Sequence, residues 1–182
     1  MFFGASAFDQ TLCWDIPENA TTTDMFTGSS GSISAESAYA MADSAALQTA
    51  VGAWCSDSTS AASTYGHIKC WDTSAVTDMS LLFSRDDADG NDVGGLYCSS
   101  YDTFDDDISA WQTSSVTNML SMFGGATSFN GDVSNFDTRS VTDMGYMFYY
   151  ATSFNGDVSN FDTSSVTTVS YTHLTLPTIH RV

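Results

Sequence analysis

Apolar residues recur along this chain in one pattern that is written several times. In the copy at 141–148 they stand at positions i, i+3, i+6 and i+7, the spacing of an apolar face on a short α-helix. The copies comprise Val76, Met79, Leu82 and Phe83; Val116, Met119, Met122 and Phe123; and Val141, Met144, Met147 and Phe148. We therefore expect one short helix in each copy, with Thr77, Thr117 and Thr142 as N-caps.

A second element of the pattern is the phrase "GDVSN", which occurs around Val133 and Val158. It is typical of a short strand with one buried position, and Ile108 and Ile68 stand at the equivalent places. A unit of strand, turn, short helix and turn cannot bury its apolar side alone, so neighbouring units must stack. The sequence therefore predicts an α/β repeat solenoid, with short parallel strands on one side and short helices on the other.

The period supports stacked units. An aromatic residue marks each register, at Trp71, Trp111, Phe136 and Phe161, and the last two steps are 25 residues each. The first step is 40 residues long, which indicates an insertion of about 15 residues before Trp111.

The repeats and their interruptions predict the organisation of the chain. We expect the end of a preceding array at 1–26, a Ser/Ala/Gly-rich linker at 27–43, a capping helix and lead-in at 44–64, the repeat array at 65–171 and a non-repeat tail at 172–182. The first methionine aligns with an internal repeat position, so we expect the array to begin upstream. The tail is similar to translated sequencing-adapter sequence, and we interpret it as artefactual.

The capping helix is predicted from "SAALQTAVGAWC", which begins at Ser44. Leu47, Val51, Trp54 and Cys55 fall on one helical face, and Ser44 is a plausible cap. An array of stacked units needs its open end covered, and this helix is placed to cover it.

The phrases "WDTSAVTDMSLLF" and "SFNGDVSNFDTRSVTDMGYMF" resemble the BspA-like leucine-rich-repeat surface protein family, whose repeat also appears in mollicute surface lipoproteins and diatom proteins. The resemblance implies a leucine-rich-repeat-like fold at the cell surface or outside the cell. It also implies adhesion, or binding of a protein or glycan, as the function.

Charge narrows the possible partners. The chain carries 22 Asp or Glu against four Lys or Arg, a net charge of -18. Such a surface repels nucleic acid, and no apolar run approaches the ~20 residues of a membrane span. The four cysteines lack paired metal-ligand spacing, so we expect two disulfides in an exported protein, with the pairing open among three connectivities.

Outward positions of the predicted strands are the candidate binding site. They repeat in register and combine carboxylates with hydroxyls, which suits many weak contacts with a protein or glycan partner. These positions are Asp107, Ser109, Asp132, Ser134, Asp157 and Ser159. The first unit of the array has His67 and Lys69 there instead.

The acidic insertion is a second candidate. The oxygen-bearing side chains of the insertion alternate as calcium ligands do, at Asp87, Asp89, Asn91 and Asp92. An EF-hand loop that began at Asp87 would require Gly at its sixth position, where this chain has Asp92. A solvated acidic loop explains the same residues. No cofactor other than calcium is indicated.

No acid, base and nucleophile converge in the sequence, so we expect no enzyme. Two alternatives to a binding module remain: a structural surface or wall spacer, and a calcium-dependent or ice-binding solenoid. Ice binding is indicated by a threonine column, Thr73, Thr113, Thr138 and Thr163. That column alternates with Asp, which disfavours a flat ice-binding plane.

Overall fold

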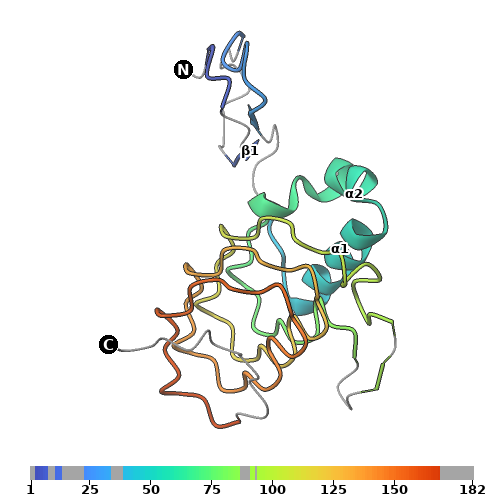
Figure 1. Ribbon diagram of the computed structural model, residues 1–182, viewed down its shortest axis with the longest axis vertical. Coiled ribbons are helices and arrows are strands. Elements are labelled where there is room, and N and C mark those ends of the chain that lie inside the picture. Colours follow the sequence, from blue (N-terminus) through green and yellow to red (C-terminus); the bar gives the residue numbers. More distant parts are fainter. Residues whose placement is uncertain are drawn as a thin grey trace.

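A computed structural model describes residues 3–7, 11–13, 23–33, 39–86, 91–92 and 94–168 (Figure 1). Its elements are the strands β1 (Thr11–Leu12) and β2 (Ser32–Ile33), the helices α1 (Ser44–Ser56) and α2 (Ser58–Tyr65), and a 3-10 helix at Ile68–Cys70. The two strands pair in parallel. No helix of the described residues is long and apolar enough to cross a membrane.

Helix α1 lies in the stretch for which the sequence predicts a helix. It buries Leu47, Val51 and Trp54. Its N-cap, however, is Asp43, whose carboxylate accepts the backbone N–H of Ala46 at 2.9 Å. The expected cap, Ser44, instead accepts the N–H of Asp78 at 2.9 Å with its hydroxyl. Ser44 therefore ties the helix to the first repeat.

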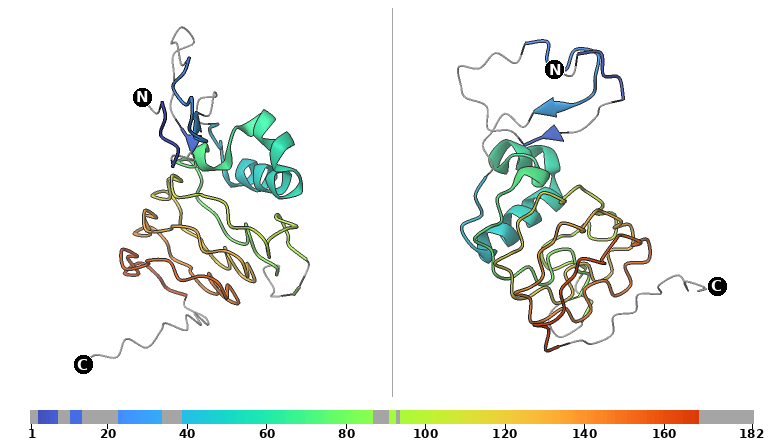
Figure 2. Two further views of the ribbon diagram at one scale, coloured as in Figure 1. Left: turned by 45° about the horizontal axis from the view of Figure 1, so that its top comes forward. Right: turned by 90° about the vertical axis from the view of Figure 1, so that its left-hand side faces the viewer.

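The repeat region is a stack of irregular coils, and Figure 2 shows them lying side by side with α1 and α2 at one end. Between residues 71 and 168 the described residues form no α-helix and no β-strand. Successive coils meet at isolated parallel bridges, Asp78 to Asn118, Asn118 to Asp143 and Asp143 to Thr168. The predicted α/β repeat solenoid with parallel strands and short helices is therefore wrong.

The helices are missing because the N–H groups that would close them point to the next coil. Those of Met119, Ser121 and Phe123 donate to carbonyls of the following coil at 2.9, 2.8 and 2.9 Å. An α-helix requires each of these groups to donate four residues back along its own chain. Ser121 also has a φ of 51°, in the left-handed region that a right-handed helix excludes. The predicted N-caps are likewise wrong, and Thr142 instead donates its hydroxyl to the carbonyl of Thr117 at 3.0 Å.

The predicted strands are turns. The N–H of Phe136 donates to the carbonyl of Val133 at 3.0 Å, and that of Trp111 donates to Ile108 at 3.0 Å, which closes a turn of the chain on itself. Val133, Ile108 and Ile68 are fully buried as the sequence predicts, whereas Val158, in the last described coil, is only partly buried. Burial at these positions therefore does not require a strand.

A buried threonine column joins the coils. Thr73, Thr113 and Thr138 are at most 2% exposed. The hydroxyl of Thr113 accepts the N–H of Asp137 at 2.7 Å and donates to the carbonyl of the same residue at 3.1 Å. One hydroxyl thus satisfies both backbone groups of a residue in the next coil, and Thr138 repeats the arrangement with Asp162.

We expect Thr113→Val to lower the free energy of unfolding by about 1–3 kcal/mol. Valine fills the same space but leaves the part-buried N–H and carbonyl of Asp137 without this partner. Thr163→Val is the matched control, since Thr163 holds the same register in the last described coil and is exposed. Urea unfolding of both variants checks the prediction, and equal stability of the two would contradict it.

Two disulfides fix the lead-in to the rest of the chain. Cys13 pairs with Cys70 across 57 residues, and Cys55 pairs with Cys98 across 43. The first joins β1 and its surroundings to the start of the repeats, while the second joins α1 to the insertion before Trp111. The pairing left open by the sequence is thereby assigned.

Candidate functional site

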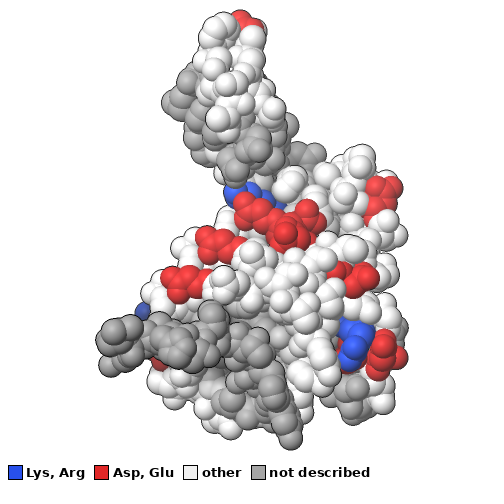
Figure 3. Space-filling model, viewed as in Figure 1, with Lys and Arg blue, Asp and Glu red and all other residues white. Residues whose placement is uncertain are grey.

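Three carboxylates of successive coils form a column, which we call the acidic column: Asp107, Asp132 and Asp157. Asp132 and Asp157 are exposed and Asp107 is half-buried. Hydrogen bonds from Ser134 lower the pKa of Asp132, while the charges of Asp107 and Asp157 act in the raising direction. The three carboxylates are therefore close enough to repel one another. Figure 3 shows acidic side chains recurring in steps along one face of the repeat region.

Each carboxylate of the acidic column is held by its own turn. The N–H groups of Ser109, Ser134 and Ser159 donate to the aspartate two residues earlier at 3.0, 2.9 and 2.8 Å. These bonds favour the ionised form, and the pKa of Asp157 is lowered by its bonds with Ser159. The predicted partner-binding residues thus pair within each coil, and the carboxylates remain charged at neutral pH.

Basic residues stand at the head of the acidic column. Lys69 Nζ lies 2.5 Å from Asp107 Oδ2. Burial raises the pKa of Asp107, but hydrogen bonds from Lys69 and Ser109 outweigh it and leave the pKa lowered. Burial also lowers the pKa of His67 despite the nearby charges of Asp106 and Asp107, so this imidazole is neutral at pH 7. The positive charge at this end is therefore that of Lys69, and it is already paired.

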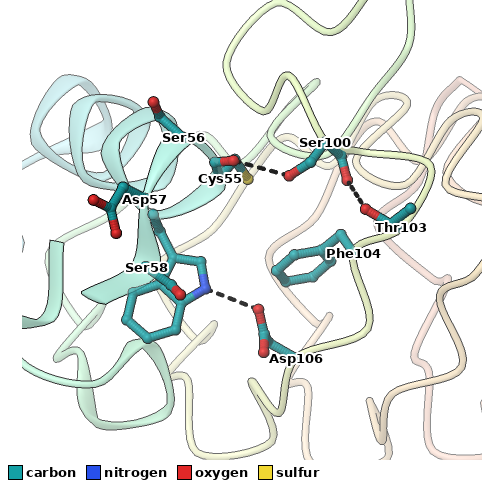
Figure 4. Close-up of a pocket in the computed structure, with 9 residues that line it drawn as sticks. Cys55, Ser56, Asp57, Ser58, Ser100, Thr103, Phe104 and Asp106 are labelled. Atoms are coloured by element: carbon teal, nitrogen blue, oxygen red, sulfur yellow. Dashed lines mark hydrogen bonds between the residues drawn. The ribbon is translucent and has the colours of Figure 1, made fainter. Parts of the chain in front are cut away.

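A cavity of about 370 Å³ lies between the end of α1 and residues 100–106 (Figure 4). It is lined by Trp54, Cys55, Ser56, Asp57, Ser58, Ser100, Thr103, Phe104 and Asp106. The indole N–H of Trp54 donates to Asp106 Oδ2 at 2.8 Å, which fixes the carboxylate against the helix. The Ser100 hydroxyl donates to the carbonyl of Cys55 at 3.0 Å and joins the two walls.

The chemistry of this cavity is that of a cation acceptor. Asp106 and several hydroxyls line it but no Lys or Arg does, while the carboxylate of Asp57 points away from it (Figure 4). Hydrogen bonds with Ser60 lower the pKa of Asp57, because this carboxylate caps α2. The sequence does not predict these residues as a site. The capping position of Asp57 is readable from the sequence, but the contact of Trp54 with Asp106 depends on packing between segments 52 residues apart.

The calcium hypothesis falls partly outside the described residues, where Asp87 and Asp89 lie. Asp92 Oδ2 is 3.7 Å from Arg85 Nε, and Asp92 also accepts the N–H of Gly94 at 3.0 Å. Asn91 is described and also takes part in an interaction. Within the part of the chain that the structure describes, no three His, Cys, Asp or Glu side chains are grouped to hold a metal ion.

Comparison with known proteins identifies a family. The family described as "Mycoplasma protein of unknown function, DUF285" matches residues 56–177, which include the whole acidic column. No curated protein and no solved structure gives a significant match to the chain.

Proposed function

Because the chain belongs to the DUF285 family of Mycoplasma proteins of unknown function, we propose that it is a non-catalytic binding protein of the cell surface or the extracellular space. The observation that carries the proposal is the acidic column. Asp107, Asp132 and Asp157 repeat at one place in three coils; Asp132 and Asp157 are held ionised by their own serines, and Asp107 by Lys69 and Ser109. The finer resemblance to BspA-like surface proteins favours adhesion to a protein as the role.

The partner that fits the acidic column is cationic. A net charge of -18 draws a positively charged surface toward the protein and repels an anionic one. Each exposed carboxylate contributes little alone, but contacts repeated along a stack act together on one partner. The cavity lined by Asp106, the chain neighbour of Asp107, has room for a basic side chain of that partner.

The acidic column can be tested with poly-L-lysine as the cationic probe. We expect the triple variant Asp107→Asn, Asp132→Asn and Asp157→Asn to bind it about tenfold more weakly than the native protein at low salt. The loss of the free carboxylates of Asp132 and Asp157 and the release of the Lys69 charge from Asp107, about 0.5 kcal/mol each, give this factor. Binding of the native protein should weaken as salt increases, because exposed charges are screened. Surface plasmon resonance measures both effects.

The matched control removes three charges from equivalent turns elsewhere on the coils. Asp72, Asp137 and Asp162 also accept the N–H two residues ahead, at 3.0, 3.2 and 2.9 Å. Asparagine at these positions gives the same net charge and keeps the same turn acceptor. We expect this control to lose less than about threefold. If both triple variants lose the same affinity for poly-L-lysine, the effect comes from net charge alone, and the result favours a structural spacer.

A further inference from the structure

The third coil departs from its own repeat at one point. The phrase "MFGGATSF" at 122–129 becomes "MFYYATSF" at 147–154, so Tyr149 and Tyr150 replace Gly124 and Gly125. Tyr150 keeps the left-handed backbone of the glycine it replaces, with a φ of 54° against 80° at Gly125. This conformation costs a non-glycine residue about 1–2 kcal/mol. A bulky residue is thus held where the fold prefers glycine, which is typical of functional positions.

The replacement creates an aromatic patch. The Tyr150 side chain is 55% exposed. Its ring lies 4.4 Å from that of Tyr149, which in turn lies 5.5 Å from Tyr146, both in edge-on contacts. Tyr146 also has a left-handed backbone, with a φ of 56°. That conformation is common to its register, which includes Leu81 and Ser121, so the unusual position is Tyr150. The three tyrosine rings meet at the surface.

Arg85 completes the patch from two coils away. Arg85, Gly125 and Tyr150 occupy the same register, and the guanidinium carbon of Arg85 lies 5.7 Å from the centre of the Tyr150 ring. A Cβ on Gly125 would lie 2.8 Å from the Cβ of Arg85. Gly125 thus leaves the space through which the arginine reaches the tyrosine, a cation–π contact that orders both side chains.

The charge of this patch is paired. Arg85 Nε donates to Asp86 Oδ1 at 2.8 Å and lies 3.7 Å from Asp92 Oδ2. The arginine therefore offers N–H groups in a fixed plane without presenting an unpaired positive charge. Together with the tyrosine hydroxyls and the carboxylates, it places hydrogen-bond donors and acceptors beside flat rings.

We propose that the patch of Arg85, Tyr146, Tyr149 and Tyr150 binds a neutral oligosaccharide. A sugar ring presents C–H groups that pack on the electron-rich face of an aromatic ring. Its hydroxyls both donate and accept, which matches the mixture of polar groups around Arg85. The net charge of -18 also does not oppose the approach of a neutral sugar.

The extent of the patch favours a sugar over a protein partner. A stable protein interface covers about 800 Å² on each partner around an apolar centre. Among the described residues the large exposed hydrophobic side chains are Phe3, Tyr39, Leu96 and Tyr150, and only Tyr150 belongs to the patch. One exposed ring with its neighbours suits one or two sugar units. The proposal concerns residues apart from the acidic column and stands independently of it.

The test restores the repeat's own sequence. The variant Tyr149→Gly, Tyr150→Gly reproduces the "MFGGATSF" phrase, so it is expected to fold. Circular dichroism and urea unfolding of the variant check that it does. An array of neutral hexasaccharides built from glucose, mannose, galactose or N-acetylglucosamine, with sulfated glycans alongside, identifies what the native protein binds. Isothermal titration then gives affinities for the best neutral hexasaccharide.

We expect the native protein to bind at least one neutral hexasaccharide and the double glycine variant to bind it at least tenfold more weakly. Arg85→Gln should weaken binding severalfold. Tyr39→Ala, which removes a tyrosine that is 42% exposed elsewhere, should leave binding unchanged. The proposal is overturned if no neutral hexasaccharide binds, if only sulfated glycans bind, or if the double glycine variant binds as well as the native protein.

Discussion

Replacing Phe129 with alanine is expected to lower the free energy of unfolding by about 3–5 kcal/mol, the range for a phenylalanine removed from a core. Phe129 is fully buried. Its ring lies 6.0 Å from Phe104, 4.0 Å from Phe123 and 5.9 Å from Phe154, stacked on all three. Phe104 and Phe154 belong to the coils before and after that of Phe129, and Phe123 belongs to the same coil. The cavity left by alanine would therefore open where the coils meet.

Phe154→Ala is the control for this effect. Phe154 has the same register in the last described coil and is only partly buried, so its removal should cost clearly less. Chemical denaturation at 25 °C compares the two variants. A loss below about 1 kcal/mol for Phe129→Ala, or equal losses for both, would show that stacked aromatic rings do not hold the coils together.

The sequence predicts register and burial well because both follow from the repeat. Val116, Met119, Met122 and Phe123 are all fully buried, as their spacing requires. The same spacing led to a wrong prediction of α-helical backbone, because apolar periodicity indicates which side chains face the core and not to which carbonyl each N–H donates. An eight-residue helix is also too short to form without tertiary support, and here tertiary contacts direct the N–H groups to the next coil.

Left-handed backbone positions could not be read from the sequence. Leu81, Ser121 and Tyr146 share one register and have φ values of 62°, 51° and 56°. Glycine or asparagine would have signalled this conformation, but none of the three is such a residue. The contacts of neighbouring coils impose it, so only the assembled stack reveals it.

Part of the candidate site is predictable from the sequence and part is not. The acidic column is predictable, because residues one period apart lie side by side in any stack of repeats. The adjoining cavity is not, because Trp54 and Asp106 lie 52 residues apart and belong to different elements. No local pattern links an indole of the lead-in helix with a carboxylate of the repeats.

The insertion before Trp111 packs closely against α1, at the point where the second disulfide joins them. Gly52 allows this approach, since a Cβ there would lie 3.2 Å from the carbonyl oxygen of Tyr97. Cys98 is fully buried, and the neighbouring Ser100 hydroxyl bonds to the carbonyl of Cys55. The disulfide therefore links two segments that already pack and hydrogen-bond with each other in the folded chain.

Removing this disulfide with Cys55→Ala and Cys98→Ala is expected to lower the free energy of unfolding by about 4 kcal/mol. The covalent link restricts the unfolded chain over a loop of 43 residues, and the entropy of that restriction gives this magnitude. Alanine at both positions leaves no free thiol, so the comparison is made by urea unfolding without reductant. Adding dithiothreitol to the native protein should lower its stability at least as far, because both disulfides then open. A variant as stable as the oxidised native protein, or peptide mapping that finds Cys55 and Cys98 as free thiols in the native protein, would contradict this role for the second disulfide.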